Sequence, residues 1–162
     1  MSIIKPSLTV RSIAEIDAGA LHRAGIKGII VNWSNTLVPR KSASAPDSVM
    51  KWLQDLKSRY GMKVVIVSNS KPPADGTGLL HDIPALFEAG KPRKKAFMAA
   101  LDILGTSKRE TAVIGDGIMT DLWGGNRLGM YTVFASPSWT RPRFLGAIKR
   151  LAVKRFACSQ IA

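Results

Sequence analysis

Four short apolar runs lie along the chain, and three of them end abruptly in small polar residues. The runs cover residues 28–31, 63–67, 111–114 and 131–134. Uninterrupted Ile- and Val-rich runs of this length are typical of strands buried on both faces of a parallel sheet. Amphipathic stretches separate the runs. Strands that alternate with helices predict a three-layer α/β domain built on a parallel sheet.

The stretches between the runs carry helix signals. Ser12 and Glu15 have the spacing of a capping box, which predicts one helix that ends at Gly25. The other expected helices follow Pro46, precede Gly105, and cover 120–128, where Gly124 and Gly125 predict an interruption. We also expect loops over 39–45 and 71–78, and a short strand within 83–87.

Length and charge narrow the class of protein. A chain of 162 residues fits one domain, expected over 1–162 with a core at about 8–137. It has no apolar run near the ~20 residues that a membrane span needs. Cys158 is the single cysteine, which favours the reducing cytoplasm. The net charge of +13 favours an anionic partner.

Polar side chains follow several of the predicted strands. In an open parallel sheet, ligands bind beyond the carboxyl ends of the strands, so these side chains are expected to meet at one edge. Each of them alone also fits a turn, a helix cap or a solvated surface charge. Their order along the chain favours a shared site. The candidates are Asn32, Ser34, Ser68, Asn69, Lys91, Asp116 and Asp121.

The same segments resemble a known family. The matching text is Ser34-Asn35-Thr36-Leu37-Val38, Val67-Ser68-Asn69, Ala89-Gly90-Lys91-Pro92, and Gly115-Asp116 with Thr120-Asp121. It resembles the haloacid dehalogenase (HAD) phosphatases. More narrowly, it is similar to their capless subclass IIIA, the YqeG-like family, which is related to the mitochondrial phosphatidylglycerophosphate phosphatases. The resemblance implies a HAD-like, Rossmann-like sheet, although the Pro-rich segment 72–78 departs from the family pattern.

The resemblance also implies roles by position. In an active member, an Asp at position 32 attacks phosphorus, and the residue at 34 protonates the leaving oxygen. Ser68, Asn69 and Lys91 would hold the phosphoryl oxygens. The Mg²⁺ ligands would be the residues at 32 and 34 together with Asp116 and Asp121.

Two of these positions depart from the family motif, because Asn32 and Ser34 stand where it has aspartates. A carboxamide has no anionic oxygen for attack and is a weaker Mg²⁺ ligand, and a hydroxyl is a poor proton donor. The resemblance therefore implies a Mg²⁺-dependent phosphomonoester hydrolase fold with impaired activity. The alternative is an inactive pseudophosphatase that binds phosphate, anionic lipid or a protein partner. In a third interpretation, Asn32 and Ser34 simply cap the end of the strand and the fold retains no chemistry.

Spacing excludes a cap domain over the site. Only 31 residues separate Thr36 from Ser68, and 22 separate Ser68 from Lys91. A loop, a helix and a strand already occupy the first of these gaps. An open site suits a bulky phosphorylated substrate such as phosphatidylglycerophosphate, or another accessible phosphate on a small molecule or lipid.

The C-terminal stretch predicts a basic amphipathic helix at about 141–157. Such a helix can lie on an anionic membrane, which would make a cytoplasmic protein peripheral to the membrane. Alternatively, its apolar face packs on the domain and its cations are merely solvated. Nucleic acid is the least favoured partner, because the chain has no recognised nucleic-acid-binding motif.

Overall fold

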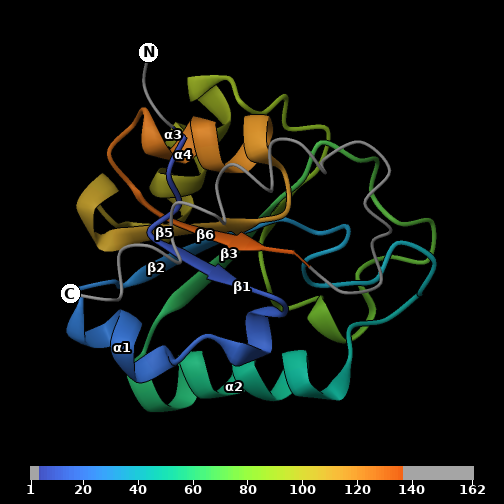
Figure 1. Ribbon diagram of the computed structural model, residues 1–162. Coiled ribbons are helices and arrows are strands. Elements are labelled where there is room, and N and C mark those ends of the chain that lie inside the picture. Colours follow the sequence, from blue (N-terminus) through green and yellow to red (C-terminus); the bar gives the residue numbers. More distant parts are fainter. Residues whose placement is uncertain (1–3, 137–162) are drawn as a thin grey trace.

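The computed structural model describes residues 4–136, which form a parallel sheet with the strand order β1-β6-β5-β2-β3-β4. Every neighbouring pair is parallel, as the sequence predicted. Strands β5 and β2 occupy the middle of the sheet (Figure 1). The strands are β1 (Leu8–Val10), β2 (Gly28–Val31), β3 (Lys63–Val67), β4 (Ala85–Leu86), β5 (Thr111–Gly115) and β6 (Tyr131–Ala135).

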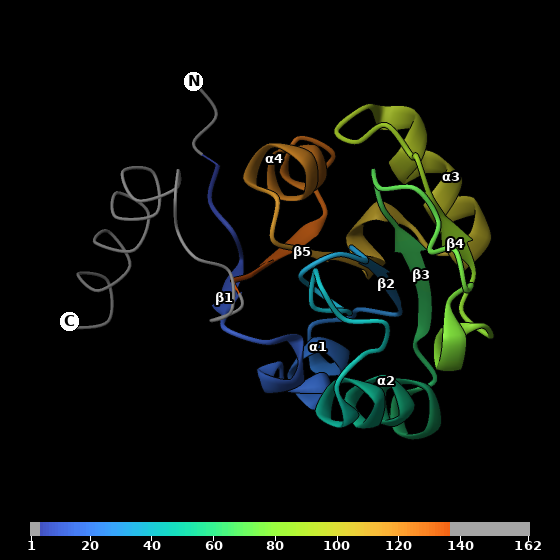
Figure 2. The ribbon, with the colours of Figure 1, turned by 90° about the vertical axis from the view of Figure 1, so that its right-hand side faces the viewer.

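Helices cover both faces of the sheet and complete three layers. Helices α1 (Ala18–Arg23) and α2 (Asp47–Tyr60) lie on one face, and α3 (Lys94–Leu104) and α4 (Trp123–Asn126) lie on the other (Figure 2). The sequence between β2 and β3 forms only a loop and α2, so it holds no cap domain. Within residues 4–136, three short 3₁₀ helices and a π-helix complete the elements: η1 (Ile13–Glu15), η2 (Gly78–Leu80), η3 (Lys108–Glu110) and η4 (Ile118–Leu122, the π-helix).

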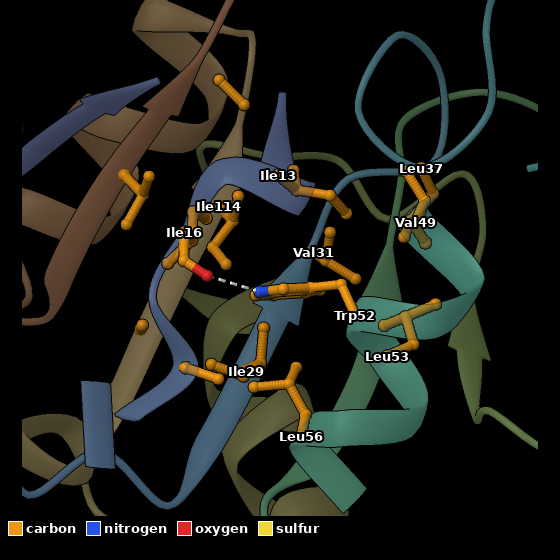
Figure 3. Packing of buried hydrophobic residues seen from close by; sticks show 14 of the residues in the cluster. Ile13, Ile16, Ile29, Val31, Leu37, Val49, Trp52, Leu53, Leu56 and Ile114 are labelled. Atoms are coloured by element: carbon orange, nitrogen blue, oxygen red, sulfur yellow. Dashed lines mark hydrogen bonds between the residues drawn. The ribbon is translucent and has the colours of Figure 1, made fainter. Parts of the chain in front are cut away.

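Successive residues of the central strands supply two separate cores. Ile29 and Val31 pack toward α1 and α2, whereas Ile30 packs toward α3. This alternation follows from the two-residue period of a strand, and it explains why the central strands are apolar throughout. In the first core the indole N–H of Trp52 donates to the carbonyl oxygen of Ile16 at 2.8 Å (Figure 3).

That hydrogen bond bears on a wrong prediction, the single helix between Ser12 and Gly25. Residues 13–15 form a 3₁₀ turn, and Ile16 is extended, which leaves its carbonyl oxygen free to accept from Trp52. Asp17 then begins α1, because its carboxylate accepts from the backbone N–H of Gly19 at 2.8 Å. A strong N-cap inside the apolar pattern divides the predicted helix into two elements.

Two other elements differ from the sequence-based prediction. Strand β1 was not predicted, because three residues are too few to show a period. The pair Gly124–Gly125 does not interrupt its helix. A Cβ at Gly124 would lie 2.5 Å from Cζ of Phe97, and one at Gly125 would lie 2.8 Å from Cγ2 of Thr132. The glycines therefore allow α4 to pack closely on its neighbours.

Most other boundaries agree with the sequence. Helix α2 begins after Pro46, and both α2 and α3 end at left-handed glycines, Gly61 (φ 62°) and Gly105 (φ 65°). The predicted basic helix over 141–157 lies outside the described residues. Within residues 4–136, no helix has the length and apolar character needed to cross a bilayer.

The residues that precede the two central strands are joined by an ion pair. Lys27 Nζ lies 2.6 Å from a carboxylate oxygen of Glu110, and the Lys27 N–H donates to the Glu110 carbonyl oxygen at 2.7 Å. Glu110 also accepts from the backbone N–H of Ser107 in a capping box. These bonds lower the pKa of Glu110 from 4.5 to about 2, and the bond with Lys27 has the largest effect.

We expect this lowered pKa to produce an acid-dependent loss of stability. The contribution of Glu110 is complete above pH 4.5 and is lost as the pH falls toward about 2, because the unfolded chain takes up the proton first. Urea unfolding of the wild type and of Glu110→Gln should therefore differ most near neutral pH and converge at about pH 2. A difference that stays constant across this range would contradict the assignment.

Candidate functional site

A cleft of about 230 Å³ lies at the carboxyl ends of β2, β3 and β5. The loops that follow β2 and β3 extend to the right of the sheet in Figure 1, on the side from which Figure 2 is viewed. Polar side chains dominate the lining. The lining residues are Asn32, Ser34, Asn35, Arg40, Ser68, Asn69, Ser70, Lys91, Asp116 and Thr120.

Asn32 follows the last residue of β2 and lies between the two neighbouring strands. Its backbone N–H donates to the carbonyl oxygen of Ile114, which extends the pairing with β5 by one residue. Its side-chain nitrogen donates to the backbone oxygen of Ser34 at 2.8 Å and to Oδ1 of Asp116 at 3.1 Å. Its side-chain oxygen accepts from Lys91 Nζ at 3.1 Å. The carboxamide therefore uses both of its ends inside the site.

A tight loop after β2 fixes the residues beyond Asn32. The backbone oxygen of Trp33 accepts from the N–H groups of Leu37 and Val38, both at 3.1 Å, and these three side chains are buried. Asn35 has a left-handed backbone (φ 62°), and its side-chain nitrogen donates to Oδ2 of Asp116 at 3.3 Å. Both carboxylate oxygens of Asp116 thus accept from a carboxamide.

Ser68 and Asn69 follow β3 and have different hydrogen-bond partners. Ser68 is 1% exposed, and its hydroxyl lies 2.8 Å from that of Ser70. Asn69 is engaged with the backbone of Lys91: its oxygen accepts from the Lys91 N–H at 2.7 Å, and its nitrogen donates to the Lys91 carbonyl oxygen at 2.8 Å. This pairing positions the loop that carries Lys91.

Lys91 forms a buried ion pair with Asp121. Lys91 Nζ lies 2.5 Å from Oδ1 of Asp121, and each side chain is 2% exposed. Burial raises the pKa of the Asp121 carboxyl above its ordinary value of 3.8, and the charge of Lys91 opposes this shift. The other oxygen, Oδ2, accepts from the Gly117 N–H at 3.0 Å. A Cβ at Gly115 would lie 2.2 Å from that same oxygen, so only glycine fits there.

The structure brings six of the seven predicted site residues to the cleft. Asn32, Ser34, Ser68, Asn69, Lys91 and Asp116 line it. Asp121 does not line the cleft but lies behind it, on Lys91.

Arg40 lines the cleft but was not predicted as a site residue. It is exposed on the loop before α2, and no salt bridge within the described part of the chain involves it. A single loop cation shows no sequence period. Its one signal is its place shortly after the polar end of β2.

This open parallel sheet carries hydroxyl, ammonium and carboxylate groups at its carboxyl edge. The chain belongs to the haloacid dehalogenase-like hydrolases, whose family model matches residues 13–129. The predicted family resemblance and the fold are thereby confirmed.

Curated relatives carry phosphatase names. The chain is 33% identical over 155 residues to the probable phosphatase YqeG of Bacillus subtilis, an alignment that covers 93% of this chain and 87% of the relative. It is 28% identical over 148 residues to a mitochondrial phosphatidylglycerophosphatase of Saccharomyces cerevisiae, covering 82% and 78%. A chloroplastic phosphatidylglycerophosphate phosphatase of Chlamydomonas reinhardtii is 27% identical, with 96% of this chain and 61% of that relative covered.

Solved structures support the fold alone. An uncharacterised protein from Listeria monocytogenes superposes with a TM-score of 0.54 at 17% identity, over 75% of this chain and 88% of that one. An uncharacterised protein from Corynebacterium glutamicum superposes with a TM-score of 0.51 at 22% identity, over 82% of this chain and 93% of that one.

The residues of the cleft do not fit the Mg²⁺ that HAD-like hydrolases generally use. Mg²⁺ requires oxygen ligands in a near-octahedral arrangement. Here the amide nitrogen of Asn32, a donor, faces the two oxygens best placed as ligands, those of Ser34 and Asp116. The amide nitrogen of Asn35, also a donor, faces the other oxygen of Asp116, and the buried amide oxygen of Asn35 has no hydrogen-bond partner within the described residues. In residues 4–136, no three His, Cys, Asp or Glu side chains are grouped to hold a metal.

Proposed function

We propose that this protein binds a phosphorylated ligand in its open cleft and hydrolyses it only slowly. One observation carries the proposal: the carboxamide of Asn32, which the family resemblance assigns to the nucleophile position, is hydrogen-bonded to Lys91 on one side and to Asp116 on the other. Names of relatives that include phosphatidylglycerophosphate phosphatases support a phosphate ligand.

Slow turnover follows from the chemistry of this group. Attack on phosphorus needs an oxygen that carries negative charge and is free to approach. The amide oxygen of Asn32 is neutral and already accepts from Lys91. Ser34 offers a hydroxyl in place of a carboxylic acid, so the leaving oxygen lacks a good proton donor. Both steps of a covalent mechanism are therefore impaired.

The groups that would hold a phosphoryl oxygen remain. Within the described residues, Asp121 and Asn32 use two of the three N–H donors of Lys91, which leaves one for a ligand. The hydroxyls of Ser68 and Ser70, which lie 2.8 Å apart, line the same cleft. We assign Arg40 to the outer part of this phosphate-binding site, because its guanidinium group matches the geometry of a phosphate.

The open edge favours a phosphate on a bulky or lipid-borne molecule. The chain places a loop and α2, with no cap, after β2, so nothing inserted there encloses a ligand. Phosphatidylglycerophosphate is the substrate class suggested by the relatives. The basic stretch 141–157, a cytoplasmic location and peripheral membrane binding stay predictions. Nucleic acid remains the least favoured partner.

A second candidate function is a pseudophosphatase that binds without any turnover. The presence of Asn32 and Ser34 at both positions where the family motif has aspartates favours it, because an aspartate retained at position 32 would have kept part of the chemistry. The two candidates share the ligand site and differ only in residual rate.

Calorimetric titration with inorganic phosphate and with a phosphomonoester tests the proposal. We expect binding by the wild type and little release of phosphate from the ester, with or without Mg²⁺. Failure of both anions to bind would overturn the proposed function. Rapid hydrolysis that Asp116→Asn abolishes would overturn the slow-turnover part alone.

Arg40→Gln should weaken phosphate binding by roughly two- to fivefold, because an exposed cation contributes modestly to an ion pair. Lys41→Gln is the matched control: it removes the same charge from the next residue, which does not line the cleft. The effect should shrink in high salt. Equal affinities for the two variants would remove Arg40 from the site.

A further inference from the structure

We infer that the Asn32 carboxamide takes the structural place of a metal ion, so that this cleft holds its phosphoryl ligand without a divalent cation. The inference rests on the proposed function for the identity of the ligand. Its claim that the cleft binds no divalent cation can be tested independently of that function. It concerns how the site is held together rather than how fast it turns over.

The first support is the pattern of hydrogen bonds. The amide nitrogen of Asn32 joins Ser34 O at 2.8 Å and Asp116 Oδ1 at 3.1 Å, and so links two oxygens from different loops. A bound cation would link such a pair of oxygens by coordination. The second oxygen of Asp116 accepts from Asn35, so neither oxygen is left without a donor.

The second support is the cost of reversing the amide. To offer its oxygen to a cation beside Ser34 and Asp116, the Asn32 side chain would have to flip. Its nitrogen would then face Lys91 Nζ, now 3.1 Å from the amide oxygen. An ammonium group and an amide nitrogen are both donors, so this arrangement loses a hydrogen bond and sets like partial charges together. Lys91 cannot easily retreat, because Asp121 holds it.

The third support is the charge of the cleft. Lys91 and Arg40 balance Asp116 and the underlying Asp121, so these four side chains sum to zero. Aspartates at 32 and 34 would add two negative charges, which one divalent cation would cancel. The substituted cleft therefore has, without metal, the balance that the carboxylate form reaches only with metal. An incoming phosphate then meets no excess negative charge.

Direct metal binding tests the inference. Mn²⁺ replaces Mg²⁺ as a probe, because electron paramagnetic resonance measures the free Mn²⁺ in solution. The measurement is made on the wild type, on Asp116→Asn, and on Asn32→Asp/Ser34→Asp. Phosphate affinity of the wild type is measured by calorimetry in EDTA and in Mg²⁺. We expect the wild type to take up no more Mn²⁺ than Asp116→Asn does, and the double variant to take up about one equivalent. Phosphate should bind the wild type equally in EDTA and in Mg²⁺.

Three results would overturn the inference. The first is Mn²⁺ uptake by the wild type that Asp116→Asn removes. The second is phosphate binding that requires Mg²⁺. The third is a double variant that is folded but does not bind Mn²⁺ either, since Asn32 would then not be the reason why the wild type binds no metal. Loss of phosphate binding in both buffers would instead refute the proposed function, and the Mn²⁺ result would still decide whether Asn32 excludes the metal.

Discussion

The double variant Asn32→Asp/Ser34→Asp is expected to hydrolyse phosphomonoesters in Mg²⁺ about 10³- to 10⁶-fold faster than the wild type, by analogy with the loss of an entire catalytic unit. An aspartate at 32 would restore an anionic oxygen beside Lys91. One at 34 would restore a proton donor for the leaving oxygen. The remaining groups, from Ser68 to Asp116, already line the cleft.

Release of phosphate from a chromogenic ester and from phosphatidylglycerophosphate provides the measurement. Asn32→Asp alone should recover part of the rate, and Ser34→Asp alone little, because the proton donor is useless without a nucleophile. Adding Asp116→Asn to the double variant should abolish the gain. A double variant that stays inert although it is folded and binds phosphate would indicate a site with no recoverable chemistry.

Lys91→Met should destabilise the fold by about 3–5 kcal/mol, which is typical when one partner of a buried ion pair is removed. It leaves the carboxylate of Asp121 buried at 2% exposure without its cation. Denaturant unfolding gives the free energy of unfolding. Adding Asp121→Asn should recover much of the loss, because the amide is neutral and its oxygen can still accept from Gly117.

Two controls define the cause of this loss. Lys27→Met also breaks a Lys–carboxylate pair, but that lysine side chain is 68% exposed, so its effect should be far smaller. The second control is pH. Burial raises the pKa of Asp121, and removing Lys91 should raise it further. The loss in Lys91→Met should therefore be smallest at acidic pH, where Asp121 is protonated in both folded proteins, and should grow as the pH rises above the raised pKa of the wild-type carboxyl. A loss that ignores pH would point to packing alone.

The sheet and its longer helices were predictable because burial leaves a direct trace in the sequence. The apolar run 28–31 and the helix ended by Gly61 need little beyond their own residues to be recognised. The break at Asp17 was not predictable in this way. Besides the N-cap at Asp17, it involves the hydrogen bond between the Ile16 carbonyl oxygen and Trp52, a residue from a different helix.

The candidate site was predictable as a set of residues but not as a network. Parallel strands bring their carboxyl ends together, and so the order of polar residues placed Asn32 near Asp116. Which end of the Asn32 amide faces Lys91 depends on the distances between three loops. The position of Asp121 behind the cleft required the π-helix Ile118–Leu122, for which the sequence carries no period. Arg40 had no signal beyond its loop.

Phosphorus nuclear magnetic resonance of one sample tests most directly whether the cleft holds phosphate without hydrolysing it. The wild type is mixed with a phosphomonoester in EDTA, and Mg²⁺ is then added. We expect the ester signal to broaden or shift on binding in both conditions, and little inorganic phosphate to accumulate. Rapid appearance of inorganic phosphate upon Mg²⁺ addition, abolished by Asp116→Asn, would contradict the assignment of Asn32 as the group that replaces both nucleophile and metal.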